Sequence, residues 1–147
     1  MNFNKYAEKG NQILDEVAAQ LGIESNRNLA YRITRAVLHT LRDRLPVQES
    51  FHLLAQLPFV LKALYVEGWK YHEKPNRKVK DVESFINSMI TEDYPAGNHD
   101  FVSGKDGENA VRGVFIVLKK HISAGESADI GKTLPGDLKS LWIPASP

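Results

Sequence analysis

Residues 34–65 read TRAVLHTLRDRLPVQESFHLLAQLPFVLKALY, and residues 111–142 read VRGVFIVLKKHISAGESADIGKTLPGDLKSLW. Aligned at an offset of 77 without a gap, they share ten identical pairs in 32 positions, whereas ordinary composition gives about two. The identical pairs are Arg35/Arg112, Val37/Val114, Leu41/Leu118, Glu49/Glu126, Ser50/Ser127, Leu57/Leu134, Pro58/Pro135, Leu61/Leu138, Lys62/Lys139 and Leu64/Leu141. Pairs such as Leu38/Phe115 also keep an apolar residue in place. We therefore expect one structural unit to occur twice.

Apolar residues at helical spacing continue on the N-terminal side of this stretch. One stripe predicts a helix over about Asn11–Leu21 that ends at Gly22, because glycine suits the left-handed conformation that closes helices. A second stripe runs from Leu29 to Leu45. Pro46 ends it, because the residue before a proline disfavours helical backbone.

Two shorter helices are expected next, over about Gln48–Gln56 and Pro58–Glu67. Pro58 breaks the apolar run but suits the first turn of a new helix, and Gly68 ends that helix. We find no sustained period-two alternation bounded by turn residues, so no sheet is expected. The sequence predicts an all-α fold.

The second unit differs from the first mainly in one loop. Its opening helix aligns at an offset of 72, so the loop Asp93–Gly107 is five residues longer than its counterpart and is expected to be flexible. The segment Ser123–Glu126 predicts a capping box at the start of a helix. We expect a single domain over 1–147 with about eight helices. It comprises pseudo-symmetric units at 1–69 and 81–147, packed as one bundle and joined by a basic linker at 70–80.

Composition limits the partners. With 19 basic and 18 acidic residues and a net charge of +1, the chain has no overall field that favours nucleic acid. A local contact through Lys70–Lys80 stays open. The absence of cysteine excludes disulfides and thiolate ligands. Short apolar runs and a polar N-terminus predict a soluble, cytoplasmic protein without a membrane span.

One pair of residues suggests metal chemistry. Glu49 and His52 have the Glu-x-x-His spacing that puts a carboxylate and an imidazole on one helix face, as in di-iron bundles. The second copy offers Glu126 and Asp129 at the matching positions, which supply oxygen ligands but no second imidazole. A surface glutamate beside a half-exposed histidine is the simpler interpretation.

Two further motifs resemble functional sites, but each has a simpler structural interpretation. Gly125–Thr133 resembles a phosphate-binding loop but has five residues between its glycines where the motif needs four. His39 and Asp43 lie one helical turn apart, so the aspartate could orient the imidazole. Their arginine neighbours favour a salt-linked solvent face or a contact between the copies. His72, His99 and His121 are isolated and receive no role.

Large aromatic residues gather at the end of the fourth helix in each unit. Core packing is the default for such side chains. The alternative is a binding groove at the seam between the units. Its candidate residues are Tyr65, Trp69, Trp142, Arg35, His39 and Arg42.

Several segments together resemble a known family. These are Leu45–Val47, Gln56–Pro58, Leu64–Trp69 and Leu134–Leu138, with the longer runs RAVLHTLRDRLP and LAQLP…LYVEGW as the most specific part. The chain resembles the bacterial family called domain of unknown function 2267 from about Ile13 to Trp142. The resemblance implies a small, duplicated all-helical protein and supplies no reaction, cofactor or catalytic residue.

Two classes of function stay open. The first is a non-enzymatic module that binds an unidentified protein or small molecule, with homodimerisation possible and no cofactor or catalytic residue predicted. The second is a metal-dependent enzyme or metal-binding bundle that uses Glu49 and His52. Nucleic-acid binding through the linker is the least favoured.

Overall fold

The computed structural model describes residues 2–72, 74–101 and 103–143, which form helices joined by turns and by a longer connection between Val66 and Val82. No strand occurs among these residues, so the predicted all-α fold class is confirmed. In chain order the helices are α1 (Phe3–Leu21), α2 (Arg27–Arg44), α3 (Val47–Gln56), α4 (Phe59–Val66), α5 (Val82–Glu92), α6 (Gly97–Asp100), α7 (Gly104–Lys119), α8 (Ala124–Thr133) and α9 (Gly136–Trp142).

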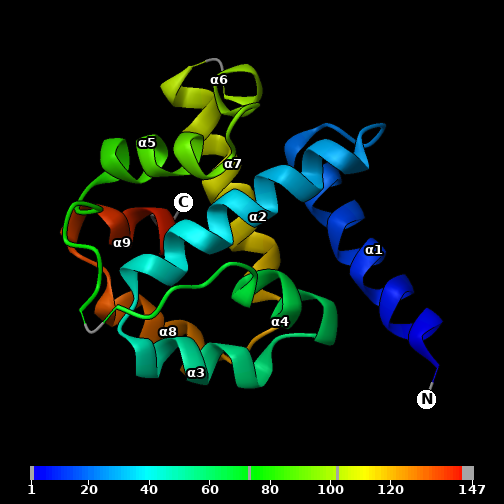
Figure 1. Ribbon diagram of the computed structural model, residues 1–147, viewed down its shortest axis with the longest axis horizontal. Helices are drawn as coiled ribbons and strands as arrows, with labels where there is room; N and C mark the ends of the chain where they lie inside the picture. Colours follow the sequence, from blue (N-terminus) through cyan, green and yellow to red (C-terminus); the bar gives the residue numbers. More distant parts are fainter. Residues whose placement is uncertain (1, 73, 102, 144–147) are drawn as a thin grey trace.

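Helix α2 runs through the middle of the bundle (Figure 1). It contacts α1, α4, α5 and α7, and α7 in turn contacts α1, α5 and α9. Val37 and Leu41 on α2 and their sequence counterparts Val114 and Leu118 on α7 are at most 3% exposed. The repeated apolar stripe therefore forms the core, where burial of each such side chain contributes roughly 1.5–3 kcal/mol.

The positions predicted from glycine and proline for the ends and starts of these helices are confirmed. Gly22 and Gly68 both have the left-handed backbone expected after a helix, with φ of 70° and 66°. Pro46 and Pro58 are the N-cap residues of α3 and α4. Helix α8 covers the whole segment that resembled a phosphate loop, so that segment is helical throughout.

Helix α1 begins at Phe3, eight residues before the predicted start at Asn11. The side chain of Asn2 accepts a hydrogen bond from the Asn4 N–H and so caps the helix there. Residues 3–9 are mostly exposed and carry no apolar stripe, which is why periodicity missed them. Gly10 is buried where α1 meets α4, and a Cβ there would lie 3.0 Å from Val60.

The loop Asp93–Gly107 is more structured than predicted. It contains the short helix α6, and α7 begins inside it at Gly104. The described residues therefore hold nine helices, and the prediction of about eight was one short. Arg32 of α2 holds the end of α6 through paired hydrogen bonds of 2.9 and 3.0 Å to Asp100.

The two aligned stretches form helices with matching bounds. Helices α3 and α8 both begin and end 77 residues apart, and α4 and α9 begin 77 residues apart. Among the described residues, no helix has both the length and the apolar character needed to span a membrane.

Candidate functional site

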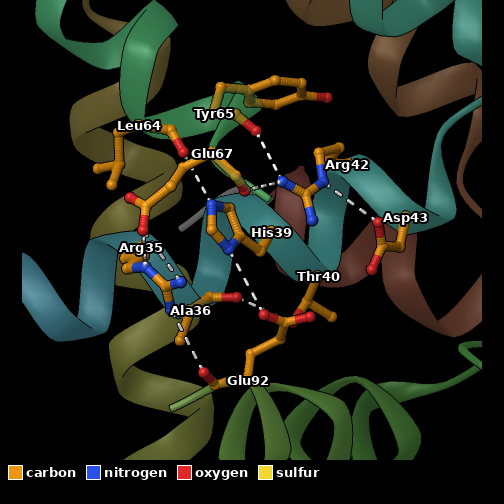
Figure 2. Close-up of polar contacts among 10 residues, drawn as sticks. All are labelled: Arg35, Ala36, His39, Thr40, Arg42, Asp43, Leu64, Tyr65, Glu67 and Glu92. Carbon is orange, nitrogen blue, oxygen red and sulfur yellow. Dashed lines mark hydrogen bonds and ion pairs between the residues drawn. The ribbon is translucent and has the colours of Figure 1, made fainter. Parts of the chain in front are cut away.

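Two side chains of α2 cap the C-terminal end of α4 (Figure 2). The last carbonyls of a helix have no partner within the helix. His39 Nε2 lies 2.7 Å from the carbonyl oxygen of Leu64, and Arg42 donates to the carbonyl oxygens of Tyr65 at 3.0 Å and Glu67 at 2.8 Å. A cation at this end of a helix is also favoured by the helix dipole.

His39 bridges α4 and α5. Its Nδ1 lies 3.4 Å from Glu92 Oε2, while its Nε2 meets a carbonyl oxygen, and the ring is 1% exposed. A carbonyl oxygen can only accept, so Nε2 donates to Leu64. The hydrogen bond from His39 lowers the pKa of Glu92 against the opposing effect of burial. Glu92, and not the predicted Asp43, is thus the carboxylate that faces this imidazole.

The second half of the chain repeats this capping scheme. Lys119 donates to the carbonyl oxygen of Trp142, and Arg112 donates to that of Ser140 at 2.7 Å. Lys119 lies 77 residues after Arg42, and Trp142 lies 77 after Tyr65. A basic residue of the long helix therefore caps the last short helix in both halves. These basic residues therefore have a structural role as helix caps, and that role needs no ligand.

The predicted groove residues differ in their exposure: two of the aromatic side chains are fully buried, and the third is half-buried. Tyr65 and Trp142 are 0% exposed, and Trp142 packs edge-on against Phe115 at 4.9 Å between ring centroids. Trp69 is half-buried and packs against Tyr65 at 6.0 Å. A ligand could reach Tyr65 or Trp142 only by displacing packed side chains, so the aromatic groove stays a prediction.

The predicted solvent face of α2 was wrong for two of its members. His39 and Arg42 are 1% and 5% exposed. They are buried because each supplies donors to carbonyls that would otherwise be unpaired. Arg42 also pairs with Asp43 at 3.2 Å, and Arg35 pairs with Glu67 at 3.3 Å.

A second cluster lies where α3 meets α8, two helices that run side by side in Figure 1. Glu49, His52 and Glu126 each offer one ligand atom, and these atoms all lie within 4.8 Å of one another. Glu126 is 5% exposed and the Glu49 side chain 12%, whereas the His52 side chain is 64% exposed. Among the described residues, neither Glu49 Oε1 nor Glu126 Oε1 has a hydrogen-bond partner.

Both glutamates occupy the third position of their helix, where a glutamate ordinarily bonds back to the N-cap N–H. In α3 the N-cap is Pro46, which has no N–H. In α8 the N–H of Ser123 is already bound to Gln56 Oε1 at 2.6 Å. The predicted capping box is therefore only half formed, through the Glu126 N–H to the Ser123 hydroxyl at 3.1 Å. Both carboxylates are thereby available to the α3–α8 seam.

The electrostatics of this cluster are unusual for a protein surface. Burial raises the pKa of Glu126 to about 7, and the hydrogen bond with Glu49 and the charges of Glu49 and Asp129 act in the same direction. Two buried carboxyl groups in contact share a proton or require a cation. One imidazole and two carboxylates form a donor set that suits Zn²⁺, Mn²⁺ or Fe²⁺. Sequence spacing predicted Glu49 and His52 as a pair and named Glu126 both as a capping residue and, with Asp129, as a possible oxygen ligand; that Glu126 lies within reach of Glu49 and His52 is visible only in the fold.

A third polar cluster was missed from the sequence. Asp93 is 7% exposed, and its Oδ2 has no hydrogen-bond partner among the described residues. Burial raises the pKa of Asp93 to about 7, and the hydrogen bond and charge of Asp100 add to this shift. For Asp100 burial opposes the change, but hydrogen bonds with Arg32 and Asp93 lower its pKa. Of the two carboxyl groups, Asp100 ties the end of α6 to α2 through Arg32.

Comparison with known proteins identifies the family of the chain. No curated protein matches the chain. A family model described as an uncharacterized conserved protein (DUF2267) matches residues 10–141, which is most of the chain and includes Glu49, His52 and Glu126. The chain therefore belongs to the DUF2267 family.

Proposed function

We propose that this protein is a binding module and that it holds one divalent metal ion at the α3–α8 seam, through Glu49, His52 and Glu126. The observation that carries the proposal is the convergence of three ligand atoms within 4.8 Å. Two of the side chains also present buried carboxylate oxygens without a hydrogen-bond partner among the described residues.

An unpaired buried carboxylate is costly, and a cation removes that cost. Donors bound at about 2.1 Å in a tetrahedral site are roughly 3.4 Å apart. The ligand atoms lie within 4.8 Å of one another, so the widest gap would have to close by up to about 1.4 Å. His52 can supply most of this movement because its side chain is 64% exposed. The closure joins α3 to α8, so metal binding is expected to stabilise the fold.

Calorimetric titration of chelator-treated protein with Zn²⁺ and Mn²⁺ tests the proposal. We expect one ion per chain, with affinity lowered at least tenfold by His52→Ala and by Glu126→Gln. His99→Ala is the matched control, because the His99 side chain is 94% exposed and lies outside the cluster. Equal affinity in the wild-type protein and in both cluster variants would show that the glutamates only share a proton.

We further propose that the seam relates two equivalent units, as the aligned stretches predict. The matching bounds of α3 and α8 support this, as do the paired caps of Arg42 on Tyr65 and Lys119 on Trp142. A partner protein, homodimerisation and a cytoplasmic location remain predictions. Native mass spectrometry of the protein purified from its host would reveal a retained partner, a dimer or a bound ion.

A further inference from the structure

A polar cleft lies on the other side of α2, away from the α3–α8 cluster. It has a volume of about 330 Å³, within the range of roughly 300–1,000 Å³ typical of small-molecule sites. Its walls are the C-terminal half of α2, one face of α5 and the segment 76–79. The Asn76 N–H donates to the carbonyl oxygen of Asp43 at 2.8 Å, which holds that segment in place.

Neutral hydrogen-bonding groups and carboxylates dominate the lining. The side chains are Asp43, Glu92, Asn76, Asn87, Ser88 and Thr91, with Thr40 and the buried Val79 behind them. Within the described part of the chain, no lysine or arginine lines this cleft. A phosphate or carboxylate ligand inside this cleft would therefore find no lysine or arginine in its walls, and Lys74 lines only the neighbouring hollow.

Both carboxylates already have a partner side chain on α2 (Figure 2). Arg42 Nε donates to Asp43 Oδ1 at 3.2 Å, and His39 Nδ1 faces Glu92 at 3.4 Å. The Asp43 and Glu92 side chains are 29% and 30% exposed, so each keeps acceptor surface toward the cleft. A compensated carboxylate retains lone pairs for hydroxyl donors but gains less from a second cation.

We infer that the cleft binds a small, uncharged, polyhydroxylated ligand such as a monosaccharide or a polyol. Asn76 uses its Oδ1 to accept the Lys78 N–H at 3.0 Å, and no hydrogen bond to the described residues occupies its side-chain nitrogen. Carboxylate acceptors, amide donors and the hydroxyls of Ser88 and Thr91 together match the alternating donors and acceptors of a sugar.

A second hollow of about 250 Å³ lies beside the cleft and is lined by Asp43, His72, Lys74 and Asn76. The two spaces share Asp43 and Asn76, so a second sugar ring could lie beside the first. None of these residues belongs to the metal cluster. Ligand binding in the cleft and metal binding at the α3–α8 seam can therefore be tested separately.

Titration of ¹⁵N-labelled protein with glucose and with the disaccharide trehalose, followed by amide NMR, tests the inference. At concentrations on the order of 100 mM, where a Kd of tens of millimolar is still visible, we expect shifts concentrated at Asp43, Asn76 and residues 87–92. Asn87→Ala and Ser88→Ala should each weaken binding roughly five- to tenfold, the equivalent of one hydrogen bond. The control Asn98→Ala, on the exposed surface of α6, should leave binding unchanged.

Parallel titrations with spermidine and with inorganic phosphate distinguish the ligand classes. Shifts at these amides with spermidine and none with either sugar would overturn the inference and identify a cation site. Shifts with phosphate alone would overturn it as well, and so would the absence of any localised shift with both sugars. A change seen only at the α3–α8 seam would also count against the cleft.

Discussion

Replacing Arg42 with methionine tests whether the basic residues of α2 serve the fold. The substitution keeps the apolar stem of a side chain that is 5% exposed but removes the donors to the Tyr65 and Glu67 carbonyls and to Asp43. Hydrogen bonds involving a charged group contribute roughly 1.5–3 kcal/mol each. The desolvation cost of the buried guanidinium offsets part of the loss. We expect a net destabilisation of about 2–4 kcal/mol.

Urea unfolding followed by circular dichroism at neutral pH measures this change, and in a thermal scan it corresponds to a fall in Tm of roughly 5–15 °C. Arg42→Lys is the informative companion, because Lys119 already performs the equivalent capping in the second half. We expect the lysine variant to recover most of the lost stability. Arg77→Met, at an exposed position, should change stability by less than about 0.5 kcal/mol. A methionine variant as stable as the wild type would refute the capping argument.

Three other substitutions, one of them with a matched control, test separate parts of the packing. Because its folded-state pKa is raised to about 7, Asp93 contributes stability that is present below about pH 4 and is lost as the pH rises through 7. Asp93→Asn should flatten this part of the curve of unfolding free energy against pH. Tyr65→Phe should cost roughly 1–2 kcal/mol in denaturant unfolding, because it removes the buried 2.7 Å hydrogen bond to Ser50. Gly97→Ala should lower the melting temperature, since a Cβ there would lie 2.2 Å from a backbone oxygen of α5, whereas Gly136→Ala, with nothing within 4 Å, should not.

Local chemistry explains what could be predicted from the sequence. Glycine and proline act on their own backbone and on the residue beside them, so Gly22, Gly68, Pro46 and Pro58 marked helix ends correctly. Apolar spacing reports only the buried face of a helix. Apolar spacing therefore predicted the buried face of α2 but missed the exposed first turns of α1.

The candidate sites depend on contacts between distant residues. Glu126 looked like a capping glutamate because its spacing from Ser123 is that of a capping box. Only the fold shows that Gln56, 67 residues earlier, occupies the Ser123 N–H. The same holds for His39, whose carboxylate partner is Glu92 on another helix and not the neighbour one turn away.

The proposed metal centre is tested most directly by anomalous diffraction from crystals grown with Zn²⁺. We predict a single strong peak within about 2.3 Å of one nitrogen of His52 and of oxygens from both Glu49 and Glu126. A peak that lies only at other histidines, such as His99 or His121, would contradict the account, as would the absence of zinc between α3 and α8.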